Sequence, residues 1–246
     1  MEEIFIKTTD NTKIALNLYK NGNDSAIIIV HGWFMSKDSA PFKNLAQMLC
    51  KNFDIISMDC RGHGKSSGKF TFTIKEQSDL HTVVKYAQKY YKKIFLLGFS
   101  LGGALVLLHA AKFNDIDAVI AVSPPAYFEN IENHFWHPRA FIPTIQKFEP
   151  QTWFSVRADL HSLLFCKKPA PANAIENIKV PVLFIAGEKD PTVGLWHTQE
   201  LYEKAKCIKK LEVIKNGIHA EDLFLANKTG FVKTCSEWFT HLYVHC

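Results

Sequence analysis

The sequence predicts an α/β protein with a mostly parallel sheet that is covered by helices on both faces. Short β-like runs alternate with longer helical patterns over the first half of the 246-residue chain, and the alternation resumes after residue 178. The run 26–30, Ala-Ile-Ile-Ile-Val, is apolar at every position, as a strand buried on both faces requires. Repeated strand–helix–strand units of this kind indicate parallel strands joined by helices that return over the sheet.

The individual elements follow in order from their local patterns. Residues 4–7 and 14–19, separated by the turn-prone Asp10-Asn11, indicate an antiparallel pair at the start of the chain. Short apolar runs predict further strands at 26–30, 54–58, 94–97, 118–122, 182–186 and 211–214. Apolar residues at helical spacing predict helices at 41–51, 75–91, 101–112, 194–206 and 221–242.

The alternation of strands and helices stops between residues 124 and 178. This segment holds seven of the ten prolines and the aromatic pairs Phe135-Trp136 and Trp153-Phe154. With about 55 residues it is small for a domain with a core of its own. We therefore expect a single domain, residues 1–246, with a small cap-like insertion at about 124–178.

Composition and charge exclude several classes of protein. The formal net charge is +5, but the lysines are scattered rather than gathered with aromatic residues on one face, so we expect no nucleic-acid partner. No run approaches the ~20 uncharged apolar residues of a membrane span, and we expect no stable membrane insertion. The acidic start, Met-Glu-Glu, and six cysteines without a C-x-x-C pair predict a cytoplasmic protein with reduced thiols. The sequence does not decide between a monomer and a homodimer.

The stretch Gly98-Phe99-Ser100-Leu101-Gly102 is the first candidate for chemistry. It follows the predicted strand 94–97 and precedes the predicted helix 101–112, so the chain must turn sharply at Ser100. A G-x-S-x-G stretch in this context is typical of a nucleophile elbow, which exposes the serine hydroxyl at a helix N-terminus. The alternative is a glycine-rich turn in which the serine only caps the helix.

A nucleophilic serine needs a general base, and the base needs an orienting carboxylate, both expected after the serine in the chain. Asp190 follows the buried strand 182–186, at an edge of the sheet where α/β proteins place their chemistry. His219 follows the last strand in the same way. We therefore predict Asp190 as the acid and His219 as the base. The other acids that we considered are Glu188, Asp159 and Asp222.

An oxyanion hole needs two backbone N–H donors. One is expected from Leu101, the residue after the predicted nucleophile, and the other from Trp33 in the loop after the third strand. Gly32 lets this loop approach closely. His31 precedes the nucleophile in the chain, and we interpret it as a brace of the loop rather than as the base.

Together these stretches resemble the α/β-hydrolase family. The resemblance rests on five motifs in the family's order, which span most of the chain: His31-Gly32-Trp33, the segment 59–66, Gly98–Gly102, Gly187–Asp190 and Gly217–His219. It implies an eight-stranded, mostly parallel sheet, the triad Ser100, Asp190 and His219, and no cofactor.

The segment 59–66, Asp-Cys-Arg-Gly-His-Gly-Lys-Ser, adds detail to the resemblance. It is similar to the loop after the fourth strand in esterases, lysophospholipase-like hydrolases and cinnamoyl esterases. The resemblance makes His63 a structural residue rather than a second base. A zinc ion held by His31 and His63 is the alternative, but no acidic or thiol group nearby completes a ligand set, so we expect no metal.

The expected reaction is the hydrolysis of a carboxylic ester with a small or medium-length acyl chain. Phe34, Phe135 and Trp136 are candidates for an apolar acyl pocket, although they could equally pack the insertion onto the sheet. A thioesterase, a peptidase, a haloperoxidase-like enzyme or an acyltransferase could use the same triad. A non-catalytic binding protein on the same fold is the remaining alternative. The expected partner is therefore a small acyl compound.

Overall fold

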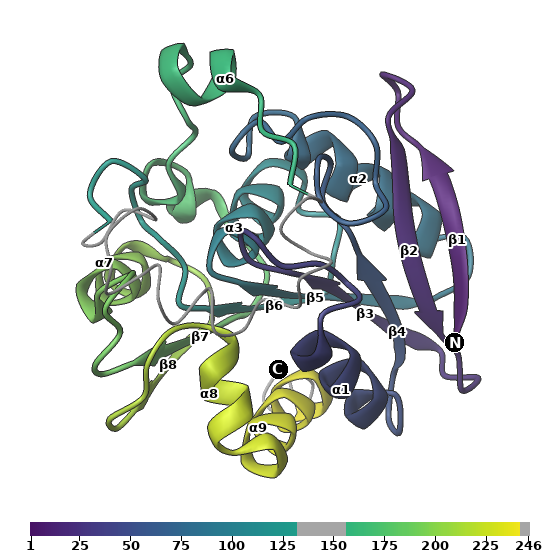
Figure 1. Ribbon diagram of the computed structural model, residues 1–246. Helices are drawn as coiled ribbons and strands as arrows, with labels where there is room; N and C mark the ends of the chain where they lie inside the picture. The colour runs from purple at the N-terminus through teal and green to yellow at the C-terminus, as the bar shows by residue number, and fades with distance from the viewer. Residues whose placement is uncertain (132–155, 242–246) are drawn as a thin grey trace.

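The protein is built on one eight-stranded sheet, seen edge-on across the middle of Figure 1. The computed structural model describes residues 1–131 and 156–241. The strand order is β1-β2-β4-β3-β5-β6-β7-β8, in which β1–β2 and β2–β4 are antiparallel and all other pairs are parallel. The strands are β1 (Glu2–Lys7), β2 (Lys13–Tyr19), β3 (Ser25–Val30), β4 (Asp54–Met58), β5 (Lys93–Phe99), β6 (Ala118–Val122), β7 (Val182–Gly187) and β8 (Lys209–Ile214). The predicted fold class is confirmed.

Helices cover both faces of the sheet, as Figure 1 shows. Helices α2, α3 and α7 lie on one face, and α1, α8 and α9 lie on the other. The helices are α1 (Ala40–Leu49), α2 (Glu76–Ala87), α3 (Leu101–Phe113), α6 (Leu160–Phe165), α7 (Leu195–Lys204), α8 (Glu221–Ala226) and α9 (Lys228–His241), with 3₁₀ turns η1 (Pro171–Asn173) and η2 (Ile175–Asn177). None of the described helices is long and apolar enough to span a bilayer.

The unbroken apolar run of β3 is explained by the two cores that the sheet separates. Ile28 packs into the core under α2 and α3, whereas its neighbours Ile27 and Ile29 pack into the core under α1 and α9. Side chains alternate between the faces of a strand, so a strand covered on both sides needs an apolar residue at every position. This burial fixes the register of the central strands, and with it the positions of the loops at their ends.

The predicted helix at 221–242 is wrong, because the chain forms two helices there. Asn227 has φ −149° and ψ 77°, outside the helical region, and it separates α8 from α9. Its side-chain Oδ1 accepts a hydrogen bond from the N–H of Gly230 at 3.0 Å, as an N-cap residue does. Apolar spacing continues across the break, with Phe224 and Phe231 packed against each other, and this continuity made the two helices look like one.

The described end of the 124–178 segment is tied to the loop between β4 and α2. Phe70 forms an isolated parallel bridge with Ala158, and its N–H donates to the carbonyl of Arg157 at 2.7 Å. The N–H of Arg157 donates in turn to the carbonyl of Gly62, also at 2.7 Å. The Arg157 guanidinium binds the carbonyl oxygens of Ser66 and Gly68. Arg157 therefore anchors the segment.

Candidate active site

Ser100 sits at a sharp turn between the central strand β5 and helix α3. Its backbone has φ 52° and ψ −116°, a conformation that side chains rarely adopt and that persists only when the surroundings enforce it. The N–H of Ser100 donates to the carbonyl of Val122 on the neighbouring strand β6 at 2.8 Å. The turn presents the side chain at the carboxyl edge of the sheet, where the sequence predicted it.

The glycines on either side of Ser100 are required by close backbone packing. A β-carbon at Gly98 would overlap the carbonyl group of Gly102, and one at Gly102 would overlap the carbonyl of Val30 at the end of β3. Any larger residue would therefore push α3 away from the sheet. The G-x-S-x-G spacing reflects these two contacts.

Ser100, His219 and Asp190 form one chain of hydrogen bonds. The Oγ of Ser100 lies 2.9 Å from Nε2 of His219, and Nδ1 of His219 lies 2.7 Å from Oδ2 of Asp190. A carboxylate oxygen only accepts, so Nδ1 carries the proton and Nε2 is left to accept from the serine hydroxyl. The structure thus brings together the three residues that the sequence predicted as nucleophile, base and acid.

Asp190 is held as a carboxylate by the groups around it. Burial alone raises the pKa of this carboxyl, but the nearby His219 and the N–H groups of Val193 and Thr192 outweigh it, so the pKa lies below its usual value. Both N–H groups donate to Oδ1 at 2.9 Å, which leaves Oδ2 for His219. The pattern fixes the direction of the carboxylate.

Two of the other residues considered as the acid of the triad have different hydrogen-bond partners. Glu188 accepts a hydrogen bond from the N–H of Asn216 at 2.9 Å. Asp159 caps helix α6, where it accepts from the N–H of His161 at 3.2 Å. Neither contact reaches His219. Asp222 lies in the first turn of α8.

The loop that carries His219 is held by Ser123, a residue that sequence reasoning missed. The N–H of Ala220, next to His219, donates to Oγ of Ser123 at 3.1 Å, and Ser123 follows directly after strand β6. Both Ser123 and Ala220 have positive φ, 47° and 48°. Ser123 directly follows the predicted strand 118–122, but no pattern in the sequence pairs it with Ala220.

The predicted oxyanion-hole loop lies against Ser100. A β-carbon built at Gly32 would come within 3.4 Å of the Ser100 Cβ, so the loop backbone is close to the nucleophile. Residues 32–35 form a turn in which the N–H of Met35 donates to the carbonyl of Gly32 at 3.3 Å. Phe34 has φ 61° within this turn. Leu101 is the first residue of α3, where backbone N–H groups have no partner within the helix.

His31 and His63 are buried behind this loop, and the contacts of His31 agree with a bracing role. Nδ1 of His31 donates to the carbonyl of Gly32 at 2.7 Å, while Nε2 accepts from the N–H of Cys60 at 3.1 Å. Burial lowers the pKa of His31 to about 4, so its ring is neutral near pH 7. Both nitrogens of His31 are engaged in these two hydrogen bonds.

The charged residues of the segment 59–66 also serve the fold. Asp59 accepts hydrogen bonds from the N–H groups of Lys37 at 2.7 Å and Lys65 at 2.9 Å. Burial raises the pKa of Asp59 to about 6. Arg61 binds Asp79 through two hydrogen bonds, of 2.7 and 2.5 Å. The segment thus ties β4 to the loop after β3, which carries Trp33, and to α2.

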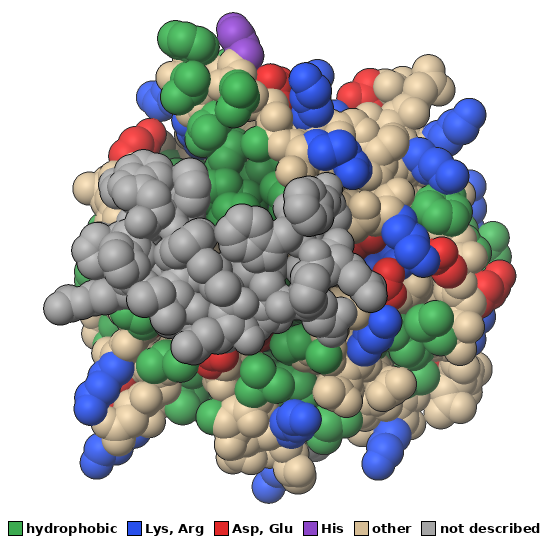
Figure 2. Space-filling model, viewed as in Figure 1, with side chains coloured by type: hydrophobic (Ala, Val, Ile, Leu, Met, Phe, Trp, Pro, Cys, Tyr) green, Lys and Arg blue, Asp and Glu red, His purple; other side chains and the backbone are tan. Residues whose placement is uncertain are grey.

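An apolar cluster lies beside the elbow. It consists of six residues: Trp33, Phe70, Phe72, Leu101, Phe128 and Leu163. Phe34, predicted for the acyl pocket, stacks on Trp33 with ring centroids 4.5 Å apart. Phe135 and Trp136 lie outside the described residues. In Figure 2, hydrophobic side chains gather at α6, at the top of the view, and continue down this face. The alternation Phe70-Thr71-Phe72 was a signal for this cluster that the sequence analysis did not use.

The sheet order and the elbow after the central strand β5 define a protein of the α/β-hydrolase type. A family model described as the alpha/beta hydrolase family matches residues 27–221, well over half of the chain. The chain therefore belongs to the alpha/beta hydrolase family, and the resemblance found in the sequence is confirmed.

The relatives of this chain include hydrolases. It is 27% identical over 224 residues to the uncharacterized protein YqkD of Bacillus subtilis (strain 168), covering 89% of this chain and 72% of that one. It is 23% identical over 231 residues to the serine hydrolase BPHL of Homo sapiens, covering 83% and 76%. The Pyrococcus furiosus esterase Pf2001 has the same fold, with a TM-score of 0.76 and 24% identity over 98% of this chain and 92% of that one.

Proposed function

We propose that this protein is a serine hydrolase that cleaves carboxylic esters through an acyl-enzyme. The observation that carries the proposal is the continuous hydrogen-bond chain from Ser100 through His219 to Asp190. A serine hydroxyl becomes a useful nucleophile when a neutral imidazole accepts its proton and a carboxylate orients that imidazole. The alpha/beta hydrolase family and its esterase and serine-hydrolase members support this assignment.

In the first half of the reaction, His219 Nε2 accepts the proton of Ser100 as Oγ attacks the carbonyl carbon. Asp190 stabilises the imidazolium that forms. The N–H groups of Trp33 and Leu101 donate to the developing oxyanion, and each such donor contributes about 3 kcal/mol in comparable sites. The imidazolium then protonates the leaving alcohol, and the acyl group stays on Ser100.

In the second half, water takes the place of the alcohol. His219 accepts a proton from the water as its oxygen attacks the acyl carbon, and the same two N–H groups hold the oxyanion. The proton then returns to Ser100 Oγ, which restores the enzyme and releases the acid. The same steps serve thioesters and amides, so the leaving group is set by what the site admits rather than by the triad.

The acyl group of the proposed substrate is small or of medium length. The apolar cluster around Phe70 and Phe72 includes Leu101, the residue after Ser100, and therefore lies beside the reacting carbonyl. In this proposal the segment 124–178 acts as a cap of a single domain and contributes Phe135 and Trp136 to the pocket. A cytoplasmic location and a homodimer stay predictions from the sequence.

The experiment is a series of p-nitrophenyl esters, from acetyl to long acyl chains, hydrolysed by wild type and by Ser100→Ala. We expect turnover in the wild type and its loss in Ser100→Ala, with unchanged thermal unfolding. The matched control is Ser78→Ala, at an exposed serine of α2, which should keep full activity. A fluorophosphonate probe should label the wild type and the control but not Ser100→Ala. A folded Ser100→Ala protein with wild-type turnover would contradict the proposal.

A further inference from the structure

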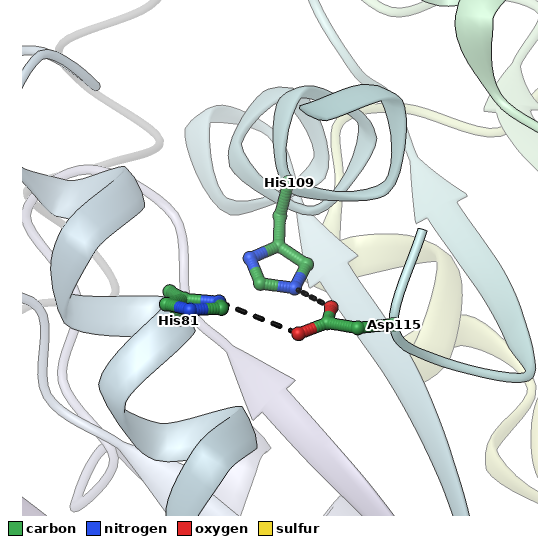
Figure 3. Close-up of side chains that lie close together, drawn as sticks. All are labelled: His81, His109 and Asp115. Atoms are coloured by element: carbon green, nitrogen blue, oxygen red, sulfur yellow. Dashed lines mark hydrogen bonds and ion pairs between the residues drawn. The ribbon is translucent and has the colours of Figure 1, made fainter. Parts of the chain in front are cut away.

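Two histidines and an aspartate come together on the face of the sheet that α2, α3 and α7 cover, away from the proposed triad. Figure 3 shows His81 on α2, His109 on α3 and Asp115 in the loop after α3, with both imidazole rings directed toward the carboxylate. Nε2 of His109 lies 2.8 Å from Oδ1 of Asp115, and Nδ1 of His81 lies 3.4 Å from Oδ2. One ligand atom from each residue lies within 4.8 Å of the others.

Part of this cluster has no hydrogen bond. Nδ1 of His81 and Oδ2 of Asp115 are both buried, and neither has a hydrogen-bond partner among the described residues, although they face each other. Oδ2 also lies 3.3 Å from Nζ of Lys85, so the two atoms have long ion-pair contacts only. Buried polar atoms are nearly always hydrogen-bonded to protein, water or an ion, which makes this pair a candidate for an additional group. A cation bound between them would satisfy both.

The spacing of the donor atoms suits a small tetrahedral ion. Zinc binds imidazole nitrogen and carboxylate oxygen at about 2.0–2.2 Å, which sets its ligand atoms about 3.4 Å apart. The two nitrogen–oxygen separations here are 2.8 and 3.4 Å, each to a different oxygen of Asp115, and the donor atoms all lie within 4.8 Å of one another, so the side chains must move closer together to bind one ion. Imidazole ligands favour zinc and its transition-metal neighbours over magnesium or calcium.

The fold holds all three side chains in place before any ion binds. His109 is fully buried on α3. His81 stacks flat on Phe113, with ring centroids 3.9 Å apart and the planes at 12°. Asn114 ends α3 in the left-handed conformation, with φ 47°, and this turn directs Asp115 back toward the helices. Ligand side chains that are already oriented lose little entropy when they bind an ion.

The local charges are compatible with a divalent cation. Burial lowers the pKa of His81 despite the nearby Asp115, so its ring is neutral and free to bind a metal near pH 7. Burial raises the pKa of Asp115, but His109 and Lys85 outweigh it and bring the pKa to about 2. Lys85 Nζ lies 3.3 Å from Oδ2, yet its side chain is 52% exposed and can turn into solvent. Lys112 is the other cation that acts on His81.

We propose that His81, His109 and Asp115 form a zinc-binding site that joins α2 to α3, with water as the fourth ligand. The site is separate from the proposed triad, because His109 lies nine residues along α3 from Ser100, about 14 Å at 1.5 Å per residue. The ion links two neighbouring helices on one face of the sheet. The proposal does not depend on the function proposed above.

The test measures zinc binding by the full chain after treatment with a chelator and removal of that chelator. We expect one Zn²⁺ per chain by isothermal titration calorimetry. At a free zinc concentration of about 100 times the dissociation constant, the melting temperature should rise by about 5 °C or more. His81→Phe keeps a ring to stack on Phe113 but loses the ligand, and Asp115→Asn keeps a side-chain oxygen to accept from His109. Each should bind zinc at least tenfold more weakly.

Among the residues that the structure describes, a second pair that could bind zinc must be separated from this site. Sγ of Cys166 lies 3.8 Å from Nδ1 of His161 on the exposed helix α6. Zinc binding that persists in Cys166→Ser supports the proposal, and binding lost there but kept in His81→Phe overturns it. Absence of any zinc binding by the wild type also overturns it. Cobalt gives a second readout, because thiolate ligands produce an intense charge-transfer band that imidazole and carboxylate ligands lack.

Discussion

Replacing Asp190 by asparagine tests how the imidazole of His219 is oriented. In the wild type, Oδ1 of Asp190 accepts from the N–H groups of Thr192 and Val193, and Oδ2 accepts from Nδ1 of His219. An asparagine that keeps the first two bonds must turn its NH₂ group toward Nδ1. Because that group donates, Nδ1 has to accept, and the imidazole proton moves to Nε2. Nε2 then faces Ser100 with an N–H and can no longer take the hydroxyl proton.

The expected loss in kcat for Asp190→Asn is about 10⁴-fold, the size found when a triad imidazole is held in the wrong tautomer, or about 5 kcal/mol. KM and the melting temperature should change little, because the substitution keeps the shape of the side chain. The assay is hydrolysis of the best p-nitrophenyl ester between pH 6 and 9. The lowered pKa of Asp190 keeps the wild-type carboxylate ionised throughout this range, so its protonation does not confuse the comparison.

The matched control for Asp190→Asn is Glu188→Gln, two residues earlier in the same loop. Glu188 accepts only from Asn216 among its described hydrogen bonds, so this change should leave kcat within about threefold of wild type. The reasoning would be refuted if Asp190→Asn kept more than about a tenth of wild-type activity. It would also be refuted if Glu188→Gln caused the larger loss, since Glu188 would then be the orienting acid.

Two further predictions concern stability and can be read from urea unfolding. Gly102→Ala should destabilise the protein by about 3 kcal/mol, because the new methyl overlaps the carbonyl of Val30, whereas Gly103→Ala meets its nearest atom at 3.2 Å and should cost less than about 1 kcal/mol. Equal losses of unfolding free energy in the two variants would contradict this prediction. Burial raises the pKa of Glu76 from 4.5 to about 7, so its contribution to stability is full below pH 4.5 and is lost as the pH rises through 7. Glu76→Gln should therefore remove a pH-dependent loss of up to about 3 kcal/mol between pH 5 and 8, and an unchanged slope would show that burial does not govern this carboxyl.

The sequence predicted the sheet and the residues of the candidate site because both depend on local patterns. Ser100 and Asp190 each follow an apolar run that indicates a buried strand, His219 follows the shorter run 211–214, and parallel strands bring their carboxyl ends to one edge. The requirement for glycine beside Ser100 is also local, since a side chain at either position would clash with nearby backbone. The break at Asn227 was missed because the apolar period continues across it and the capping contact with Gly230 is invisible in a pattern of apolar residues.

Other features depend on how the helices pack and could not be predicted. His81, His109 and Asp115 have no motif spacing, and they meet only because α2 lies beside α3 and the turn at Asn114 reverses the chain. The bond from Ala220 to Ser123 joins residues 97 positions apart. Its donor lies in a loop whose course is fixed by tertiary contacts. No rule on propensity or periodicity contains this information.

The position of His219 has a consequence for how the protein would fail on heating. Strand β8, which leads into the His219 loop, is the edge strand of the described sheet and pairs with β7. Its residues are all half-buried or exposed, while those of β5, which leads to Ser100, are almost all buried. Edge elements open at a lower free energy than central ones. A brief detachment of β8 would separate His219 from Ser100, which stays fixed. Inactivation would therefore begin at β8 while most of the molecule is still folded.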